Sequence, residues 1–134
     1  FSKKLLNDSF VCSVNTLSTV ALKNNGNFNF SEIQLPNQVQ FSPVYSITHA
    51  DVDNDGDLDV LMGGNLYNVK PEVGSYDASY GLFLENTPKG LIYEPNGRGF
   101  NIKGEIRSLV VDDDQLWVGR NRDTLSRFTF KNYK

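Results

Sequence analysis

The sequence lacks several features that would place it in a common functional class. It has one cysteine among 134 residues, which excludes an internal disulfide and a zinc site of the CxxC type. Its apolar runs are all shorter than the roughly 18 residues that a membrane-spanning helix needs. Thirteen Lys and Arg stand against sixteen Asp and Glu, which gives a net charge of −3. We therefore expect neither a membrane span nor a basic surface for nucleic acid.

Residues that commonly carry catalysis are also scarce. His49 is the only histidine, and no serine or cysteine lies in a recognisable nucleophile motif, so no catalytic triad is indicated. We interpret His49 as an ordinary strand residue. Cys12, in "SFVCSV", is expected to be a small buried side chain. The sequence thus favours a protein that is not an enzyme.

Helical periodicity is missing as well, whereas the residues that favour β-structure are frequent. The chain has nine Phe, six Tyr and eleven Gly. Turn-forming stretches such as "NNGN" and "NTPKG" separate short apolar runs and suit tight hairpins. We predict an all-β chain built from antiparallel strands.

Three segments share one pattern, a short apolar run that ends in Asn. They are "SFVCSVN" (9–15), "DVLMGGN" (59–65) and "QLWVGRN" (115–121). A second strand-like run follows each of them, and the pattern returns after about 60 residues. A repeat of this length with four short antiparallel strands is typical of a β-propeller blade. Two stacked hairpins of a β-sandwich are the alternative.

The repeat divides the chain into three parts. Residues 1–40 are predicted to form an incomplete first blade without its opening strand, residues 41–103 a complete blade, and residues 104–134 a last, incomplete blade. Because two or three partial blades cannot close a ring of four to eight, we expect an open fragment from the C-terminal end of a longer protein. The first residue, which is not Met, favours the same interpretation. Open sheet edges predict self-association with a second copy.

The most distinctive segment is "HADVDNDGDLDVLMGGN", residues 49–65, in which five aspartates occupy alternate positions. Gly56 permits the positive-φ turn that brings the last aspartate round to the others. Ca²⁺ takes six to eight oxygen ligands from carboxylates and carbonyls, whereas Mg²⁺ keeps its waters and suits such a cage less well. The predicted calcium ligands are the side chains of Asp51, Asp53, Asp55 and Asp59 and the backbone carbonyl of Asp57.

These aspartates have two other interpretations. An EF-hand does not fit, because Met62 stands where the bidentate Glu belongs and the flanking segments have the character of strands. A solvated acidic turn without a metal is the simpler alternative.

The segment "DVDNDGDLDVLMGGN", with an apolar strand before it and "GLFLENTPKG" after it, resembles FG-GAP/VCBS repeats, the blades of integrin α-subunit-like propellers. The resemblance covers nearly the whole chain. It implies that the loop joins the first two strands of a blade, that the same five aspartates hold Ca²⁺, and that the parent is a bacterial surface protein. The third unit departs from the pattern. In "VVDDDQLWVG" the loop's glycine is lost, so a plain acidic turn is expected at Asp112, Asp113 and Asp114.

A long loop, residues 65–80, follows the second strand of the complete blade, where the first unit has about four residues. In a blade this loop lies on the face opposite the metal loop, and long insertions often carry function. Tyr67, Tyr76 and Tyr80 suit stacking on a sugar or packing against a protein, and the alternative is that they pin the loop to the blade. We predict a protein or carbohydrate partner on this face.

Together these features predict a calcium-binding propeller segment that serves as an interaction scaffold outside the cell, at the cell surface or in the periplasm. The metal would have a structural role. Part of a propeller-type polysaccharide hydrolase or lyase is the alternative. It would need two carboxylates about 5–10 Å apart in a pocket, and the dense carboxylate cluster of this chain is already assigned to the metal.

Overall fold

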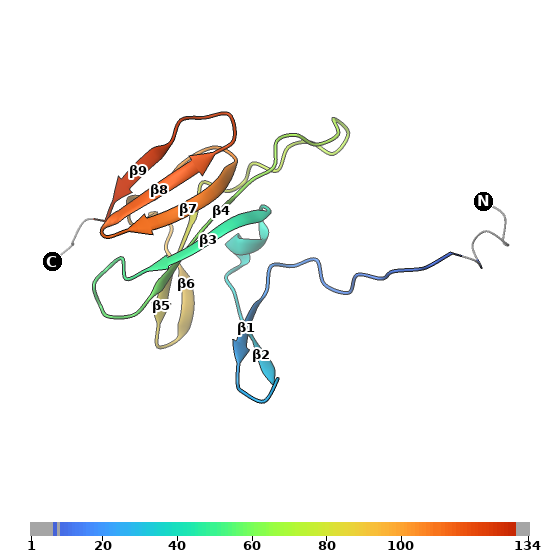
Figure 1. Cartoon of the computed structure of the whole chain (residues 1–134), viewed down its shortest axis with the longest axis horizontal. Helices are drawn as coiled ribbons and strands as arrows, with labels where there is room; N and C mark the ends of the chain where they lie inside the picture. The colour runs from blue at the N-terminus through green and yellow to red at the C-terminus, as the bar shows by residue number, and fades with distance from the viewer. Residues whose placement is uncertain (1–6, 8, 131–134) are drawn as a thin grey trace.

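The computed structural model describes residue 7 and residues 9–130, and in these residues the strands form three antiparallel sheets (Figure 1). The strands are β1 (Ala21–Asn24), β2 (Phe30–Ile33), β3 (Val44–Ala50), β4 (Asp59–Gly64), β5 (Leu82–Thr87), β6 (Gly90–Tyr93), β7 (Ile106–Asp112), β8 (Gln115–Arg120) and β9 (Ser126–Thr129). Two 3-10 helices, η1 (Asn37–Gln40) and η2 (Gly97–Gly99), lie between strands. The sheets follow chain order: β1-β2, then β3-β4-β5-β6, then β7-β8-β9. The prediction of an all-β antiparallel fold is confirmed.

The four-stranded sheet is apolar on both faces, which explains why β4 has a nearly continuous apolar sequence. Leu61 pairs with Phe83 across β4 and β5, and Met62 pairs with Leu82. Because side chains alternate along a strand, these two pairs point to opposite faces. All four side chains are buried, so the sheet is covered on both sides.

The main core lies between the four-stranded and the three-stranded sheet. Its buried members are Val52, Leu61, Phe83, Phe100, Ile106, Leu109, Leu116 and Val118. The innermost strands β3 and β7 lie side by side (Figure 1), and the Leu109 amide donates to the Ser46 hydroxyl oxygen across 2.9 Å. Gly63 in β4 allows the two sheets to approach each other closely, because a Cβ there would lie 2.4 Å from Cγ2 of Ile106 in β7. The packing of the two sheets therefore depends on a glycine in β4.

The opposite face of the four-stranded sheet is covered by the segment around η1. A second cluster of buried side chains lies there: Val39, Met62, Leu82 and Leu84. Leu35, Val44 and Tyr93 pack against it. The second cluster is smaller than the first because one short segment, rather than a whole sheet, supplies its cover.

The β3–β4 and β7–β8 hairpins are built alike. Val44 pairs with Gly64 and Ser46 with Gly63, with a register shift between the two pairs. Ile106, 62 positions after Val44, begins β7 and pairs with Arg120, and the same shift recurs before Ser108. The sequence repeat is therefore a structural repeat down to the position of its bulge.

Two predictions for the N-terminal part are wrong. Residues 9–15 form no strand, and the segment extends away from the sheets (Figure 1). Cys12 is exposed rather than buried. An apolar run becomes a buried strand only where a neighbouring strand pairs with it and a second layer covers it, and the described chain places neither beside this segment.

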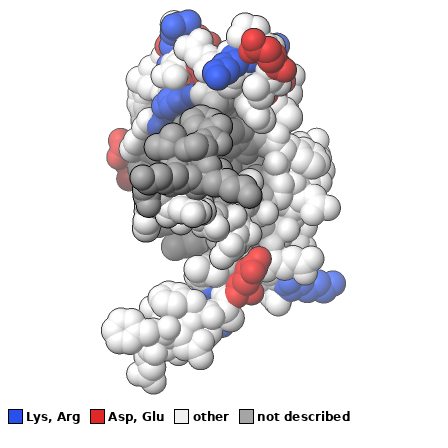
Figure 2. All heavy atoms as spheres, turned by 90° about the vertical axis from the view of Figure 1, so that its right-hand side faces the viewer, with Lys and Arg blue, Asp and Glu red and all other residues white. Residues whose placement is uncertain are grey.

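The β1–β2 hairpin is exposed as well. Leu22 is 59% exposed, Phe30 53% and Phe28 99%. In Figure 2 the lower lobe, which corresponds to the hairpin at the bottom of Figure 1, carries few charged side chains. The first unit thus contributes a paired but thinly covered hairpin, in contrast to the packed sheets that follow.

Candidate metal centre

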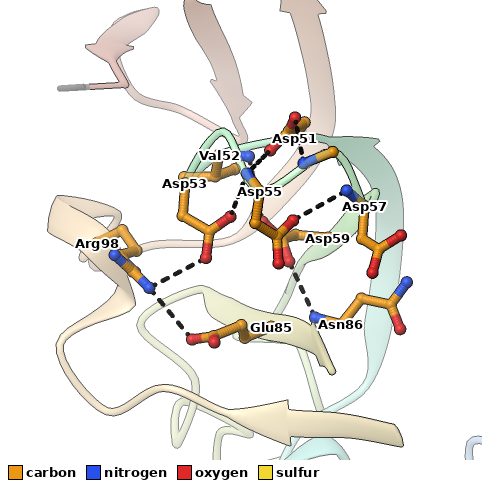
Figure 3. A network of polar contacts seen from close by, with 10 residues as sticks. Asp51, Val52, Asp53, Asp55, Asp57, Asp59, Glu85, Asn86 and Arg98 are labelled. Carbon is orange, nitrogen blue, oxygen red and sulfur yellow. Dashed lines mark hydrogen bonds and ion pairs between the residues drawn. The ribbon is translucent and has the colours of Figure 1, made fainter. Parts of the chain in front are cut away.

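The loop between β3 and β4 brings three aspartates together. One carboxylate oxygen from each of Asp51, Asp53 and Asp55 lies within 4.8 Å of the other two (Figure 3). Alternate residues point inward because the chain curls instead of continuing β3. The convergence predicted from the sequence is therefore present for these three side chains.

Backbone amides hold the carboxylates of the loop in place. Asp51 accepts from the amides of Asp55 and Gly56, at 3.2 and 3.1 Å. The amide of Asp55 also approaches Asp53 Oδ1 at 3.3 Å, and Asp57 donates its amide to Asp55 Oδ1 at 2.9 Å. Gly56 has φ of 96°, a conformation that residues with a side chain rarely adopt. Sequence spacing and one glycine thus shape the loop.

Asp59, at the start of β4, has a different environment. The residue is 1% exposed, its Oδ2 accepts from the Val52 amide at 3.1 Å, and its Oδ1 accepts from the Asn86 amide at 2.9 Å. Burial raises the pKa of Asp59, and the two amide hydrogen bonds oppose that shift. The carboxylate therefore ties the beginning of the loop to β5 beneath the group of three. The fifth predicted residue, Asp57, is exposed.

An arginine that sequence reasoning missed completes the polar network. Arg98 Nη2 lies 3.2 Å from Asp53 Oδ2 and 3.2 Å from Glu85 Oε2 (Figure 3). Arg98 sits in η2 with φ of 48°, between two glycines that also have positive φ, Gly97 and Gly99. The stretch "GRG" signals a turn, but nothing in it indicates a partner 45 residues earlier.

The donor set of the loop fits a hard cation. Its side-chain donors are carboxylate oxygens, and no histidine or cysteine belongs to the group. Oxygen-only sites suit Ca²⁺ and Mg²⁺, while zinc and copper favour nitrogen and sulfur. Arg98 offsets one of the three negative charges, so the cluster keeps a net attraction for a cation.

The corresponding connection of the third unit is a two-residue turn. Asp112 pairs with Gln115, and Asp113 between them has φ of 53°. Among the described residues, the acidic group that meets the geometry of a metal site is the one in the β3–β4 loop.

The 65–80 loop lies at the other end of the four-stranded sheet (Figure 1). Asn65, 1% exposed, anchors it: Oδ1 accepts from the Ser42 hydroxyl and the Ser79 amide, and Nδ2 donates to the carbonyls of Ser79 and Gly104. A buried amide with four hydrogen bonds fixes both ends of the loop against neighbouring segments.

The three tyrosines of this loop are not gathered at one site. Tyr67 is half-buried, and its amide donates to Glu105 Oε1 at 2.8 Å. Tyr76 pairs through its backbone with Leu66 but leaves its side chain exposed, and Tyr80 is also exposed. Tyr67 therefore belongs to the anchor of the loop, while Tyr76 and Tyr80 present rings to solvent.

Comparison with known families gives this geometry a context. Residues 6–62 match the family model of the FG-GAP-like repeat. This match, which covers less than half of the chain, is consistent with an FG-GAP repeat protein. The match runs from ahead of β1 to Met62 in β4, so it includes the whole acidic loop and confirms the family resemblance for this part of the chain. The wider extent of the resemblance, over nearly the whole chain, stays a prediction. A search among curated proteins and another among solved structures found no match.

The FG-GAP-like repeat points to a propeller-like interaction scaffold. The matched segment contains the two-stranded sheet β1-β2, the whole of β3 and the first part of β4. Within the part of the chain that the structure describes, no helix has the length and apolar character required to cross a membrane.

Proposed function

We propose that the chain is a calcium-stabilised propeller segment that presents its loops to a protein or carbohydrate partner outside the cell. The observation that carries the proposal is the convergence of the Asp51, Asp53 and Asp55 carboxylates within 4.8 Å. FG-GAP repeats often bind calcium and are typically extracellular, which supports both the choice of ion and the location.

The metal has a structural role in this proposal. Carboxylates that converge repel one another, and that repulsion opposes closure of the loop. A bound Ca²⁺ would reverse the sign of the interaction through Asp51, Asp53 and Asp55, with the Asp57 carbonyl and the Asp59 carboxylate as the further predicted donors. Sites of extracellular modules bind Ca²⁺ with dissociation constants on the order of 10⁻⁴ to 10⁻³ M, which suits the calcium concentration outside cells.

The proposal contains no catalytic step. Glycoside cleavage needs two carboxylates that flank the scissile bond. The converging carboxylates of the β3–β4 loop are engaged by amides of their own loop, as the contacts of Asp51 and Asp55 show. This arrangement favours a cation over a sugar at that end of the sheet.

A thermal melt of the chain in Ca²⁺, in Mg²⁺ and in chelator tests the proposal. We expect Ca²⁺ to raise Tm more than Mg²⁺, with one site per chain in a calorimetric titration. Asp53→Asn and Asp55→Asn should remove most of the Ca²⁺ effect. Asp113→Asn, in the matching turn of the third unit, is the control and should leave it intact. Equal Tm in Ca²⁺ and chelator, or equal losses in all three variants, would contradict a metal at this loop.

A further inference from the structure

A hollow of about 300 Å³ lies where the 65–80 loop joins β5, and it is separate from the acidic loop. Four aromatic residues from different segments line it: Phe41 after η1, Tyr80 before β5, Tyr93 in β6 and Phe100 after η2. Its volume falls at the small end of the range of ligand pockets, which is roughly 300–1,000 Å³.

The walls of the hollow are fixed by contacts within the fold. Phe100 is 3% exposed, and its ring lies so close to the backbone of Gly81 that a Cβ there would meet it at 2.7 Å. The Ile102 amide donates to the Tyr80 carbonyl at 2.7 Å. The ring of Tyr80 therefore projects from a backbone that is tied down on one side and packed on the other, so the shape exists before a ligand arrives.

Two polar side chains around the rings make no hydrogen bond within the described chain, whereas Glu94 Oε1 accepts from the Asn96 amide at 3.3 Å. Gln38 and Asn101 line the hollow, and within the described chain their side-chain amides make no hydrogen bond. Glu94 is the one charged residue among the described residues that line it. Phe41 is 59% exposed and Tyr80 48%, so both residues are accessible to a ligand.

This combination selects among ligand classes. Amides donate and accept at once, and a carboxylate accepts, so together they can satisfy hydroxyl groups, which also do both. A pyranose ring has an apolar face of C–H groups that stacks on an aromatic ring, whose negative face attracts them. An anionic ligand would meet Glu94 without a compensating Lys or Arg in the lining.

We infer that this hollow binds a neutral carbohydrate, with Tyr80 as the stacking platform and Gln38, Glu94 and Asn101 as hydrogen-bonding groups. The inference rests on the proposed scaffold function and names its ligand class. It also distinguishes the two exposed tyrosines of the loop, because Tyr76 lines an adjoining depression that shares Phe41 with the hollow but does not include Tyr80.

The test is saturation-transfer NMR and calorimetry with glucose, galactose, mannose, N-acetylglucosamine and their linear trisaccharides, with galacturonic acid as the anionic probe. At least one neutral probe should bind. Tyr80→Ala should weaken that binding about tenfold, the size expected for the loss of one aromatic contact. Tyr76→Ala is the matched control, because its ring is 44% exposed on the same loop, and it should retain affinity. Tyr80→Phe keeps the ring and should bind within about threefold of the wild type.

The inference is overturned if no neutral probe binds, if galacturonic acid binds most tightly, or if Tyr76→Ala weakens binding as much as Tyr80→Ala. A thermal melt of the same sample with and without Ca²⁺ tests the proposed function separately. A rise of Tm in Ca²⁺ without sugar binding would contradict this inference alone. Sugar binding without a rise of Tm in Ca²⁺ would contradict the metal site alone.

Discussion

The β3–β4 and β7–β8 hairpins share one register and one bulge, yet they close in different ways. Residues 51–58 join β3 to β4, whereas two residues, Asp113 and Asp114, join β7 to β8. Since the short connection joins an equivalent pair of strands, a long connection is not needed to form such a hairpin. The acidic loop is thus an addition to a hairpin that both units share, and strand pairing does not explain its residues.

The two connections also differ in what their aspartates do. In the long loop, the carboxylates of Asp51 and Asp55 turn back onto amides of their own loop and converge. In the short turn the acids stand in consecutive positions, and among the described residues they do not form a group with the geometry of a metal site. The number of aspartates is therefore a poor guide to whether their carboxylates converge, and their spacing is a better one.

The largest expected effect is on the free energy of unfolding, and it concerns two glycines in matching positions of the two hairpins. Gly63 pairs with Ser46 and Gly119 with Ser108. A Cβ at Gly63 would lie 2.4 Å from Ile106, but at Gly119 the nearest atom is the Cβ of Ser108 at 3.4 Å. We expect Gly63→Ala to lower the free energy of unfolding by about 3 kcal/mol, at the upper end for overpacking, and Gly119→Ala by about 0.5 kcal/mol or less.

Urea denaturation of both variants in chelator provides the measurement, since metal binding then adds nothing. Equal losses in the two variants would show that the sheets do not meet at Gly63 as the structure places them.

The next effect concerns the added loop. Replacing residues 51–58 with the Asp-Asp pair of the β7–β8 turn should keep the strands and abolish the response to Ca²⁺. At a Ca²⁺ concentration 100 times the dissociation constant, a single site contributes about 2.7 kcal/mol, so this is the difference that should vanish. Circular dichroism checks that the strands persist, and melts with and without Ca²⁺ measure the response. A surviving Ca²⁺ shift would place the site elsewhere in the chain.

The contrast between the hairpins also separates what sequence could predict from what it could not. The convergence of Asp51, Asp53 and Asp55 was predictable because the pattern behind it is local: alternate aspartates, one glycine and strand-like flanks. The side-chain partner of Asp53 was not, since Arg98 reaches it only after the chain has passed through β4, β5 and β6. Pattern likewise suggested a strand at 9–15, but strand formation depends on a neighbour that the local sequence does not specify.

Arg98 provides a smaller and more specific test. In chelator, Arg98→Gln removes the cation between Asp53 and Glu85, and we expect a loss of about 0.5–1 kcal/mol in the free energy of unfolding. In Ca²⁺ we expect the same substitution to strengthen Ca²⁺ binding a few-fold, because a positive charge next to the site has been removed. Arg127→Gln, on β9 with its guanidinium over the Trp117 ring, is the control of equal charge change. Weaker Ca²⁺ binding in Arg98→Gln would mean that Arg98 positions Asp53 instead of competing with the metal.

The smallest effect concerns the end of the hairpins opposite the acidic loop, where Glu105 occupies the place that Pro43 has in the earlier unit. The backbone carbonyl of each residue accepts a hydrogen bond from an amide. Pro43 accepts from Asn65, and Glu105 accepts from Asn121. Only Glu105 adds a carboxylate, and a hydrogen bond from the Tyr67 amide, helped by the nearby Arg107, lowers its pKa below the ordinary 4.5.

A lowered pKa means that the folded state holds the proton less tightly than the unfolded state does. The stabilisation by Glu105 is therefore complete above pH 4.5 and is lost as the pH falls through the lower, folded-state value. Melts between pH 6 and pH 3, in chelator to exclude the metal, should show a steeper loss of Tm in the wild type than in Glu105→Gln, which keeps an acceptor for Tyr67 but does not titrate. If Tm of the two proteins falls in parallel with pH, the charge of Glu105 does not stabilise the anchor of the 65–80 loop. The loop would then be held by hydrogen bonds that do not depend on that charge, among them those of Asn65.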